Sequence, residues 1–171
     1  MLIDKYLSVY DFKEFHSIKA NGPANEIYHK MLHRDLSGAT VVTLLFWLRG
    51  IPKRAYTIEG LTKMGFIKLE ENPGDEIVFG IVTESPMFNG CVSISSPSLF
   101  IETKGQRIIK AVINFKVEEQ GSSKCVVSTE TRIWCGSREM KSKFRAYWFF
   151  VRPFSQIIRR YMLRQIKRLS T

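Results

Sequence analysis

A carboxylate and an imidazole two positions apart, Glu14 and His16, are the pair in this sequence best placed to do chemistry. They lie within Val9–Ala20, where polar and apolar residues alternate in the way typical of a β-strand. Side chains two positions apart on a strand point to the same side, so the two groups share a face. If that face is buried, the pair suits a polar anchor for a ligand or an acid–base pair. A structural ion pair or an exposed cross-strand ladder would use the same residues.

A second pair, His29 and His33, has the four-residue spacing of two metal ligands on one helix face. Lys30 follows His29 where the HExxH motif has glutamate, and no third ligand accompanies the pair. We therefore expect no metal here, and no cofactor elsewhere. The sequence also lacks the GxSxG, Walker A and GxGxxG motifs of nucleophilic, nucleotide-binding and dinucleotide-binding sites.

The net charge of +10 is concentrated in one segment. Residues 138–168 hold ten Lys or Arg residues and one acid, Glu139, so this segment carries +9 and the rest of the chain is almost neutral. A basic amphipathic helix suits an anionic membrane surface or nucleic acid, but a solvated charged face would look the same. The charge alone does not decide between these.

The remaining bulk features predict a soluble cytoplasmic protein. The longest apolar run, Val41–Leu48, is much shorter than the roughly 20 residues that span a bilayer. No signal peptide is indicated at the N-terminus. Cys91, Cys125 and Cys135 are odd in number and lack metal-type spacing, so we expect reduced, buried thiols.

The elements that would position these residues form an α+β pattern over a single domain, residues 1–171. The predicted helices are Ala24–Arg34, Ala39–Arg49, Thr57–Lys63 and Arg138–Leu169. The predicted strands are Val9–Ala20, Phe66–Glu70, Glu76–Val82, Ser98–Thr103, Arg107–Glu118 and Lys124–Cys135. Alternation assigns two inward-facing sets: Tyr10, Phe12, Glu14, His16, Ile18 and Ala20; and Ile109, Ala111, Ile113, Phe115 and Val117. Pro153 should kink the last helix or split it into two segments near Phe149–Arg152.

This order of elements resembles the helix-grip topology of the START-like or SRPBCC superfamily, which includes the birch-pollen-allergen-like proteins and the polyketide cyclases. Several short segments carry the resemblance: Tyr10-Asp11-Phe12, Pro23-Ala24-Asn25-Glu26-Ile27-Tyr28, Pro73-Gly74-Asp75-Glu76 with Gly80, Thr129-Glu130-Thr131-Arg132, Phe144-Arg145-Ala146-Tyr147-Trp148, and Phe154-Ser155 with Ile158-Arg159-Arg160. The segments from Thr129 onward are similar to an uncharacterised bacterial branch of the superfamily.

The resemblance implies a curved antiparallel sheet wrapped around the long C-terminal helix, with two short helices after the first strand. It also implies a cavity between sheet and helix that holds a lipid-like or aromatic molecule. The candidate ligand-binding residues are Phe12, His16, Phe100, Ile113, Phe115, Arg132, Tyr147 and Trp148. In this fold the first and last strands pair, so Glu130 or Arg132 could approach Glu14 and His16. His16 and Glu130 are therefore the candidates for catalysis.

Three functions fit this sequence. The first is binding of a small hydrophobic or lipid-like ligand between the sheet and the C-terminal helix, without catalysis. The second is a cyclase or aromatase-type enzyme that acts on a polyketide-like or aromatic substrate through His16 and Glu130. The third is association of the basic helix with an anionic membrane or with nucleic acid. Nucleic acid is disfavoured, because the helix is needed to close the core and no nucleic-acid motif accompanies it.

Overall fold

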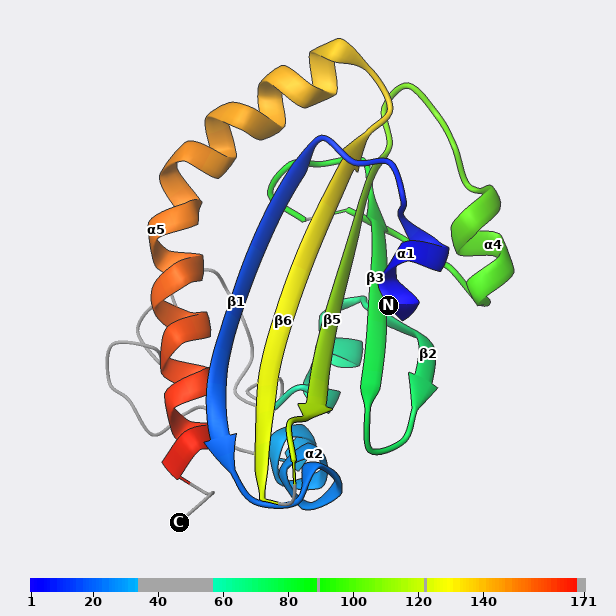
Figure 1. Cartoon of the computed structure of the whole chain (residues 1–171). Helices are drawn as coiled ribbons and strands as arrows, with labels where there is room; N and C mark the ends of the chain where they lie inside the picture. Colours follow the sequence, from blue (N-terminus) through cyan, green and yellow to red (C-terminus); the bar gives the residue numbers. More distant parts are fainter. Residues whose placement is uncertain (34–56, 89, 122, 169–171) are drawn as a thin grey trace.

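The structure is a computed structural model that describes residues 1–33, 57–88, 90–121 and 123–168. Its α+β architecture is a six-stranded antiparallel sheet with a long C-terminal helix, which is the helix-grip arrangement (Figure 1). The strands are β1 (Phe12–Asn21), β2 (Ile67–Asn72), β3 (Glu76–Thr83), β4 (Cys91–Val92), β5 (Ile109–Glu119) and β6 (Lys124–Cys135). The helices are α1 (Leu2–Tyr6), α2 (Ala24–His33), the 3-10 helix η2 (Glu59–Met64), α4 (Pro97–Glu102) and α5 (Arg138–Arg168).

The sheet places its first and last strands side by side. Its strand order is β1-β6-β5-β3-β2, with β4 paired to the end of β3. The first strand therefore lies beside the last one, and Phe12 is opposite Ile133 while Asn21 is opposite Lys124. Strand β6 pairs on its other side with β5, from Glu119 opposite Cys125 to Ile109 opposite Cys135.

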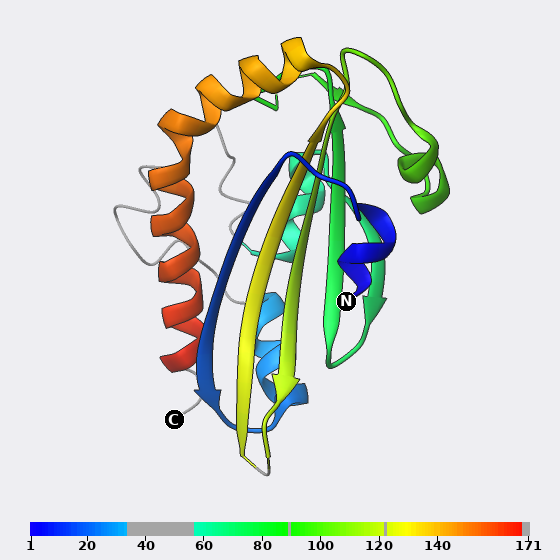
Figure 2. The same ribbon diagram turned by 45° about the horizontal axis from the view of Figure 1, so that its top comes forward.

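Helices cover both faces of the sheet, as Figures 1 and 2 show. We call the side that packs against α5 and α2 the α5 face, and the side that packs against α1 and α4 the α1 face. The α5 face carries two apolar clusters, one with Phe144 of α5 and one with Met162, Leu163 and Ile166 of α5. The α1 face carries a third cluster, centred on Ile3 and packed under the two short helices.

Several sequence predictions are confirmed. The even-numbered residues of β1 from Phe12 to Ala20 face α5, and so does the predicted inward set of β5. Helix α2 buries the predicted residues Ile27, Tyr28, Met31 and Leu32. Strand β6 has the predicted bounds, and it holds Cys125 and Cys135 as free, buried thiols, whereas Cys91 is exposed.

One predicted strand is wrong. The predicted strand Ser98–Thr103 is helix α4, which begins at Pro97. The Ser96 hydroxyl accepts a hydrogen bond from the Leu99 amide at 3.1 Å, so the segment is capped as a helix rather than paired as a strand. The alternatives predicted for Pro153 were a kink or a split: α5 is a single helix through Pro153, so it is not split, and it bends near its middle, which agrees with the kink (Figures 1 and 2). The predicted helix Ala39–Arg49 lies outside the described residues.

Candidate functional site

A buried carboxylate lies on the α5 face of the edge strand β1. Glu14 projects from β1, and its Oε1 atom is 2.8 Å from Nε2 of His16, two residues along the same strand. The other carboxylate oxygen, Oε2, is the buried side-chain N or O atom that lacks a hydrogen-bond partner in the part of the chain that the structure describes. An unpaired buried carboxylate oxygen costs about 1–3 kcal/mol, so it needs a physical explanation.

Helix α5 contributes a cation at the same level. The Arg159 guanidinium donates hydrogen bonds to the hydroxyls of Thr129, at 3.2 Å, and of Thr131 on β6. Strand pairing places Thr129 opposite His16 and Thr131 opposite Glu14. Five polar side chains from three elements thus form one band across the α5 face. We call this band the polar belt: Glu14, His16, Thr129, Thr131 and Arg159.

Apolar side chains flank the polar belt on both sides along the strands. Toward the N-terminal end of α5, Phe12 packs against Phe144 with ring centroids 5.0 Å apart, and Tyr147 and Trp148 lie 5.9 Å and 5.7 Å from the same ring. Toward the other end of α5, the cluster around Ile166 fills the space between the sheet and α2. A molecule lying along α5 at the polar belt would therefore meet polar groups in its middle and apolar surface at either end.

The centre of the α5 face is incompletely covered. Ile113 lies on the central strand β5, opposite Thr131 and so at the level of the polar belt. It is only partly buried, as are His16 and Ile18 of β1. Apolar side chains in the middle of a sheet face are normally fully buried by the layer above. Ile113 thus marks a place where α5 leaves room over the sheet.

The structure separates Glu130 and Arg132 from His16. Both project from β6 to the α1 face, because Glu130 pairs with Phe15 and Arg132 pairs with Lys13, whose side chains point away from α5. The predicted pairing of His16 with Glu130 is therefore wrong, and Glu14 is the carboxylate that contacts His16. Arg132 is likewise not placed to bind a ligand held against α5.

The pair on the α1 face, Glu130 and Arg132, is instead part of a structural network of hydrogen bonds and ion pairs. Nε of Arg132 donates to Oε1 of Glu130 at 2.6 Å, and the same oxygen is 3.1 Å from Nζ of Lys13. The other guanidinium nitrogens of Arg132 donate to the Leu7 carbonyl at 2.9 Å and to Asp4 at 2.7 Å. The Arg132 hydrogen bond holds the pKa of Asp4 below its usual value. This network fixes the chain around α1 to β6.

Phe100 also lies on the α1 face and not at the predicted ligand site. Helix α4 buries it in the cluster with Ile3, directly over Gly80 of β3. A Cβ atom at Gly80 would lie 2.8 Å from the Phe100 ring, so the missing side chain makes room for that ring. Lys110 approaches the same ring at 5.1 Å and donates to the Ile101 carbonyl at 2.9 Å.

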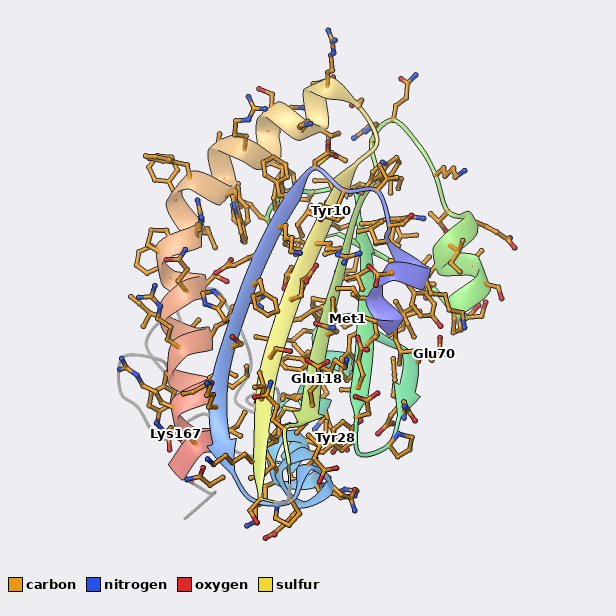
Figure 3. All side chains as sticks on the ribbon, viewed as in Figure 1. Met1, Tyr10, Tyr28, Glu70, Glu118 and Lys167 are labelled. Carbon is orange, nitrogen blue, oxygen red and sulfur yellow. The ribbon has the colours of Figure 1, made fainter. Side chains whose placement is uncertain are left out.

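Of the predicted ligand-binding residues, six share the α5 face: Phe12, His16, Ile113, Phe115, Tyr147 and Trp148. Glu14, predicted with His16 as a polar anchor, lies on the same face, whereas sequence reasoning did not assign Thr129, Thr131 or Arg159 to the site. The sequence does show that Thr129 and Thr131 alternate with Glu130 and Arg132, so the two threonines must point to the opposite face of β6 from Glu130 and Arg132. Figure 3 gives the arrangement of the side chains around β1, β6 and α5.

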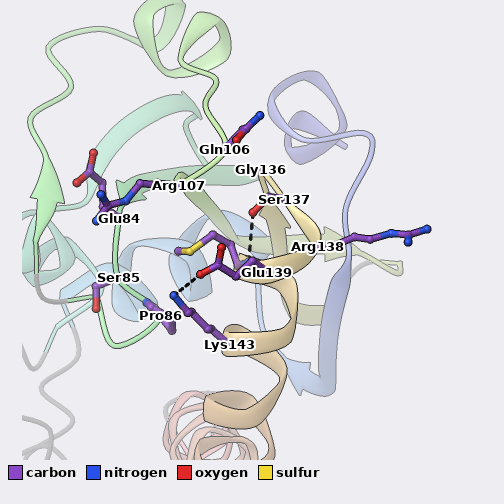
Figure 4. Close-up of a pocket in the computed structure, with 11 residues that line it drawn as sticks. Glu84, Ser85, Pro86, Gln106, Arg107, Gly136, Ser137, Arg138, Glu139 and Lys143 are labelled. Carbon is purple, nitrogen blue, oxygen red and sulfur yellow. Dashed lines mark hydrogen bonds and ion pairs between the residues drawn. The ribbon is translucent and has the colours of Figure 1, made fainter.

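A separate open pocket of about 790 Å³ lies at the N-terminal end of α5 (Figure 4). Its walls come from the segment after β3, the segment before β5 and the first turns of α5, and Glu139 and Lys143 form an ion pair of 2.6 Å inside it. Met140, which lines the pocket, also packs in the apolar cluster with Phe144. None of the ligand-binding or catalytic residues predicted from the sequence lines this pocket.

The described residues contain neither a metal-binding cluster nor a helix suited to cross a bilayer. In the part of the chain that the structure describes, no three His, Cys, Asp or Glu side chains are grouped to hold a metal ion. Within the same residues, no helix combines the length and apolar character that a bilayer crossing requires. His33 of the predicted histidine pair lies 3.3 Å from Glu59.

Comparisons with known proteins identify no family. No protein-family model matches the chain, and no curated protein matches it. Among solved structures, a conserved protein from Geobacillus kaustophilus aligns with a TM-score of 0.37 and 10% identity, over 92% of this chain and 93% of that one. A truncated norcoclaurine synthase from Thalictrum flavum aligns with a TM-score of 0.34 and 12% identity, over 94% and 95% of the two chains. Similarity of this degree identifies neither a family nor a ligand.

Proposed function

We propose that this protein binds a small, largely apolar molecule between the sheet and α5, with one hydrogen-bond donor of that molecule paired to Glu14. The observation that carries the proposal is the unpartnered Oε2 of Glu14, buried between two apolar clusters. A charged oxygen in such a place is stabilised when a donor reaches it, and the ligand supplies that donor. The proposal includes membership of the START-like superfamily.

The polar belt defines the chemistry of the ligand. Glu14 accepts hydrogen bonds and carries negative charge, so it favours a hydroxyl or amine and disfavours a carboxylate. Phe12, Tyr147 and Trp148 surround Phe144 on one side of the belt and provide aromatic contact surface. The preferred ligand class is therefore an alcohol or amine with an extended apolar body.

The test uses N-phenyl-1-naphthylamine, an apolar dye with one N–H donor whose fluorescence rises in apolar surroundings. Bound dye is displaced with 1-decanol or with decyl methyl ether, which share an apolar chain but differ in having a donor. We expect the alcohol to compete at least tenfold better with the wild-type protein, since a hydrogen bond to a charged group contributes about 1.5–3 kcal/mol.

The control is the same competition with Glu14→Met, in which the two competitors should become equal. A protein that binds no dye, or that binds both competitors equally before the substitution, would refute the proposal. Native mass spectrometry of the freshly purified protein then identifies the molecule that it retains from the cell.

A second candidate function rests on the Glu14–His16 contact. A carboxylate that holds one imidazole nitrogen at 2.8 Å orients the ring for proton transfer, as a cyclase or aromatase-type enzyme requires. The imidazole would accept a proton from an activated carbon of a polyketide-like or aromatic substrate and return it to another position. Deuterium exchange at the central carbon of an apolar 1,3-diketone tests this. His16→Gln should abolish exchange while dye binding persists, and exchange at the rate of buffer alone would exclude the function.

A further inference from the structure

Helix α5 exposes a group of large apolar side chains on the side that faces away from the sheet. Phe149 and Phe150 are 76% and 71% exposed, and their rings contact each other edge to face with centroids 5.5 Å apart. Phe154 and Ile157 are also exposed, one and two turns further along. We call these four residues the aromatic patch. Contiguous exposed apolar side chains of this size mark an interaction surface.

Within the described residues, the aromatic patch takes no part in packing α5 on the sheet. Helix α5 packs on the sheet through other residues, chiefly Phe144 near its start and Met162, Leu163 and Ile166 near its end. Phe144 is buried whereas Phe149 and Phe150 are exposed, because the helical period places Phe144 on a different side of α5 from the other two. The aromatic patch is therefore a second apolar surface that no contact within the described residues explains.

Exposed cations share the side of the helix that carries the aromatic patch. Phe150, Ile157 and Arg164 follow each other at seven-residue intervals, so they lie close to one line along the helix. Arg160 and Lys167 continue the same side, and Lys167 lies near the C-terminal end of α5 in Figure 3. Between Glu139 and Arg168 the sequence has no acidic residue. The surface thus combines an apolar centre with positively charged residues.

We propose that this face of α5 docks on an anionic lipid bilayer, with the aromatic patch inserted at the headgroup level. The proposal is independent of the ligand held at Glu14. Apolar side chains beside Arg and Lys on one helix face match a negatively charged, partly apolar interface. A second copy of the chain is disfavoured as the occupant, because two helices of charge +9 would repel each other. A polynucleotide would be attracted by the charge but gains nothing from aliphatic Ile157.

The experiment measures co-sedimentation of the full chain with vesicles of pure phosphatidylcholine and of phosphatidylcholine with 30% phosphatidylserine. We expect binding to the second kind only, with a steep loss on raising the salt concentration. Phe149→Ser with Phe150→Ser should weaken binding on the order of tenfold or more, because each ring contributes apolar burial. The matched control is Phe15→Ser, which removes an exposed phenylalanine from the opposite face of the sheet and should leave binding unchanged.

Insertion is read separately from attraction by a Phe150→Trp variant, whose emission should shift to the blue and be quenched by brominated lipid. Three results would overturn the proposal: absence of binding to anionic vesicles, equal binding by the double serine variant, or emission that stays at the value for water. If the patch instead joins two copies, the wild-type protein will sediment as a dimer and the double variant as a monomer. Binding to single-stranded nucleic acid but not to vesicles would assign the surface to that partner and refute ours.

Discussion

Replacing Glu14 by methionine should stabilise the unliganded protein while it removes selective ligand binding. Methionine has a similar length, no charge and no need for a partner. Removing the unpaired buried oxygen should raise the free energy of unfolding by about 1–3 kcal/mol, and losing the His16 contact should lower it by about 1 kcal/mol. The net gain is up to about 2 kcal/mol, which corresponds to a rise in Tm of up to roughly 8 °C for a chain of this size.

The matched control is Glu130→Met on the opposite face of the sheet. The Glu14 and Glu130 side chains are 4% and 2% exposed, so both are buried glutamates of adjacent strands. Glu130 differs in being paired with Arg132 and Lys13, so its removal leaves a buried guanidinium with less compensation and should cost about 3–5 kcal/mol. The two substitutions are thus expected to change stability in opposite directions.

The assay is urea unfolding followed by circular dichroism, with the unliganded protein prepared by unfolding and refolding to remove bound molecules. An equal slope of free energy against urea in all three proteins shows that the comparison is between similar folded states. If Glu14→Met lowers the free energy of unfolding by more than about 1 kcal/mol, as Glu130→Met should, then the Glu14 carboxylate stabilises the fold. The argument from its unpaired oxygen would then fail.

Three further predictions concern stability. Burial and, second, the charge of Lys104 lower the pKa of Lys110 to about 8. As the pH rises, the Lys110 ammonium therefore loses its proton in the folded state before it does in the unfolded chain. The free energy of unfolding should rise by up to about 3 kcal/mol between pH 8 and pH 10.5. Urea unfolding at several pH values should show that Lys110→Met lacks this rise, and an identical rise would exclude Lys110 as its source. Gly136→Ala should cost about 3 kcal/mol in thermal unfolding, because the new Cβ atom would lie 1.7 Å from the Gly105 carbonyl oxygen; an unchanged Tm would contradict that packing. Arg159→Met should reduce amide protection of residues 155–166 in hydrogen exchange, since it removes the bonds from α5 to β6, while a change confined to other elements would speak against this link.

The fold was largely predictable because most of its elements have one polar and one apolar side. Strand β5 alternates clearly, with Ile109, Ala111 and Ile113 toward α5, and helix α2 has its apolar residues at helical spacing. The segment at Phe100 was misread because its apolar residues fit a strand equally well. Ser96 and Pro97 were the stronger signal, since a serine N-cap followed by proline begins a helix.

The face of Glu130 and Arg132 was much harder to predict. Strand β6 is buried on both sides, so polar and apolar residues occur on each face and the period of two does not distinguish inside from outside. Only the strand pairing decides that Thr131 lies beside Glu14 and that Glu130 does not. The contact between Arg159 and these threonines depends on how α5 bends over the sheet, which no local pattern records.

A crystal structure of the protein soaked with 1-decanol tests the central claim most directly. The account predicts electron density for the alcohol between the sheet and α5, with its hydroxyl within hydrogen-bond distance of Glu14 Oε2 and its chain along Ile113 and the rings around Phe144. Density for the alcohol elsewhere, such as in the pocket beside Lys143, would contradict it. So would an unliganded structure in which a side chain of the protein itself already donates to that oxygen.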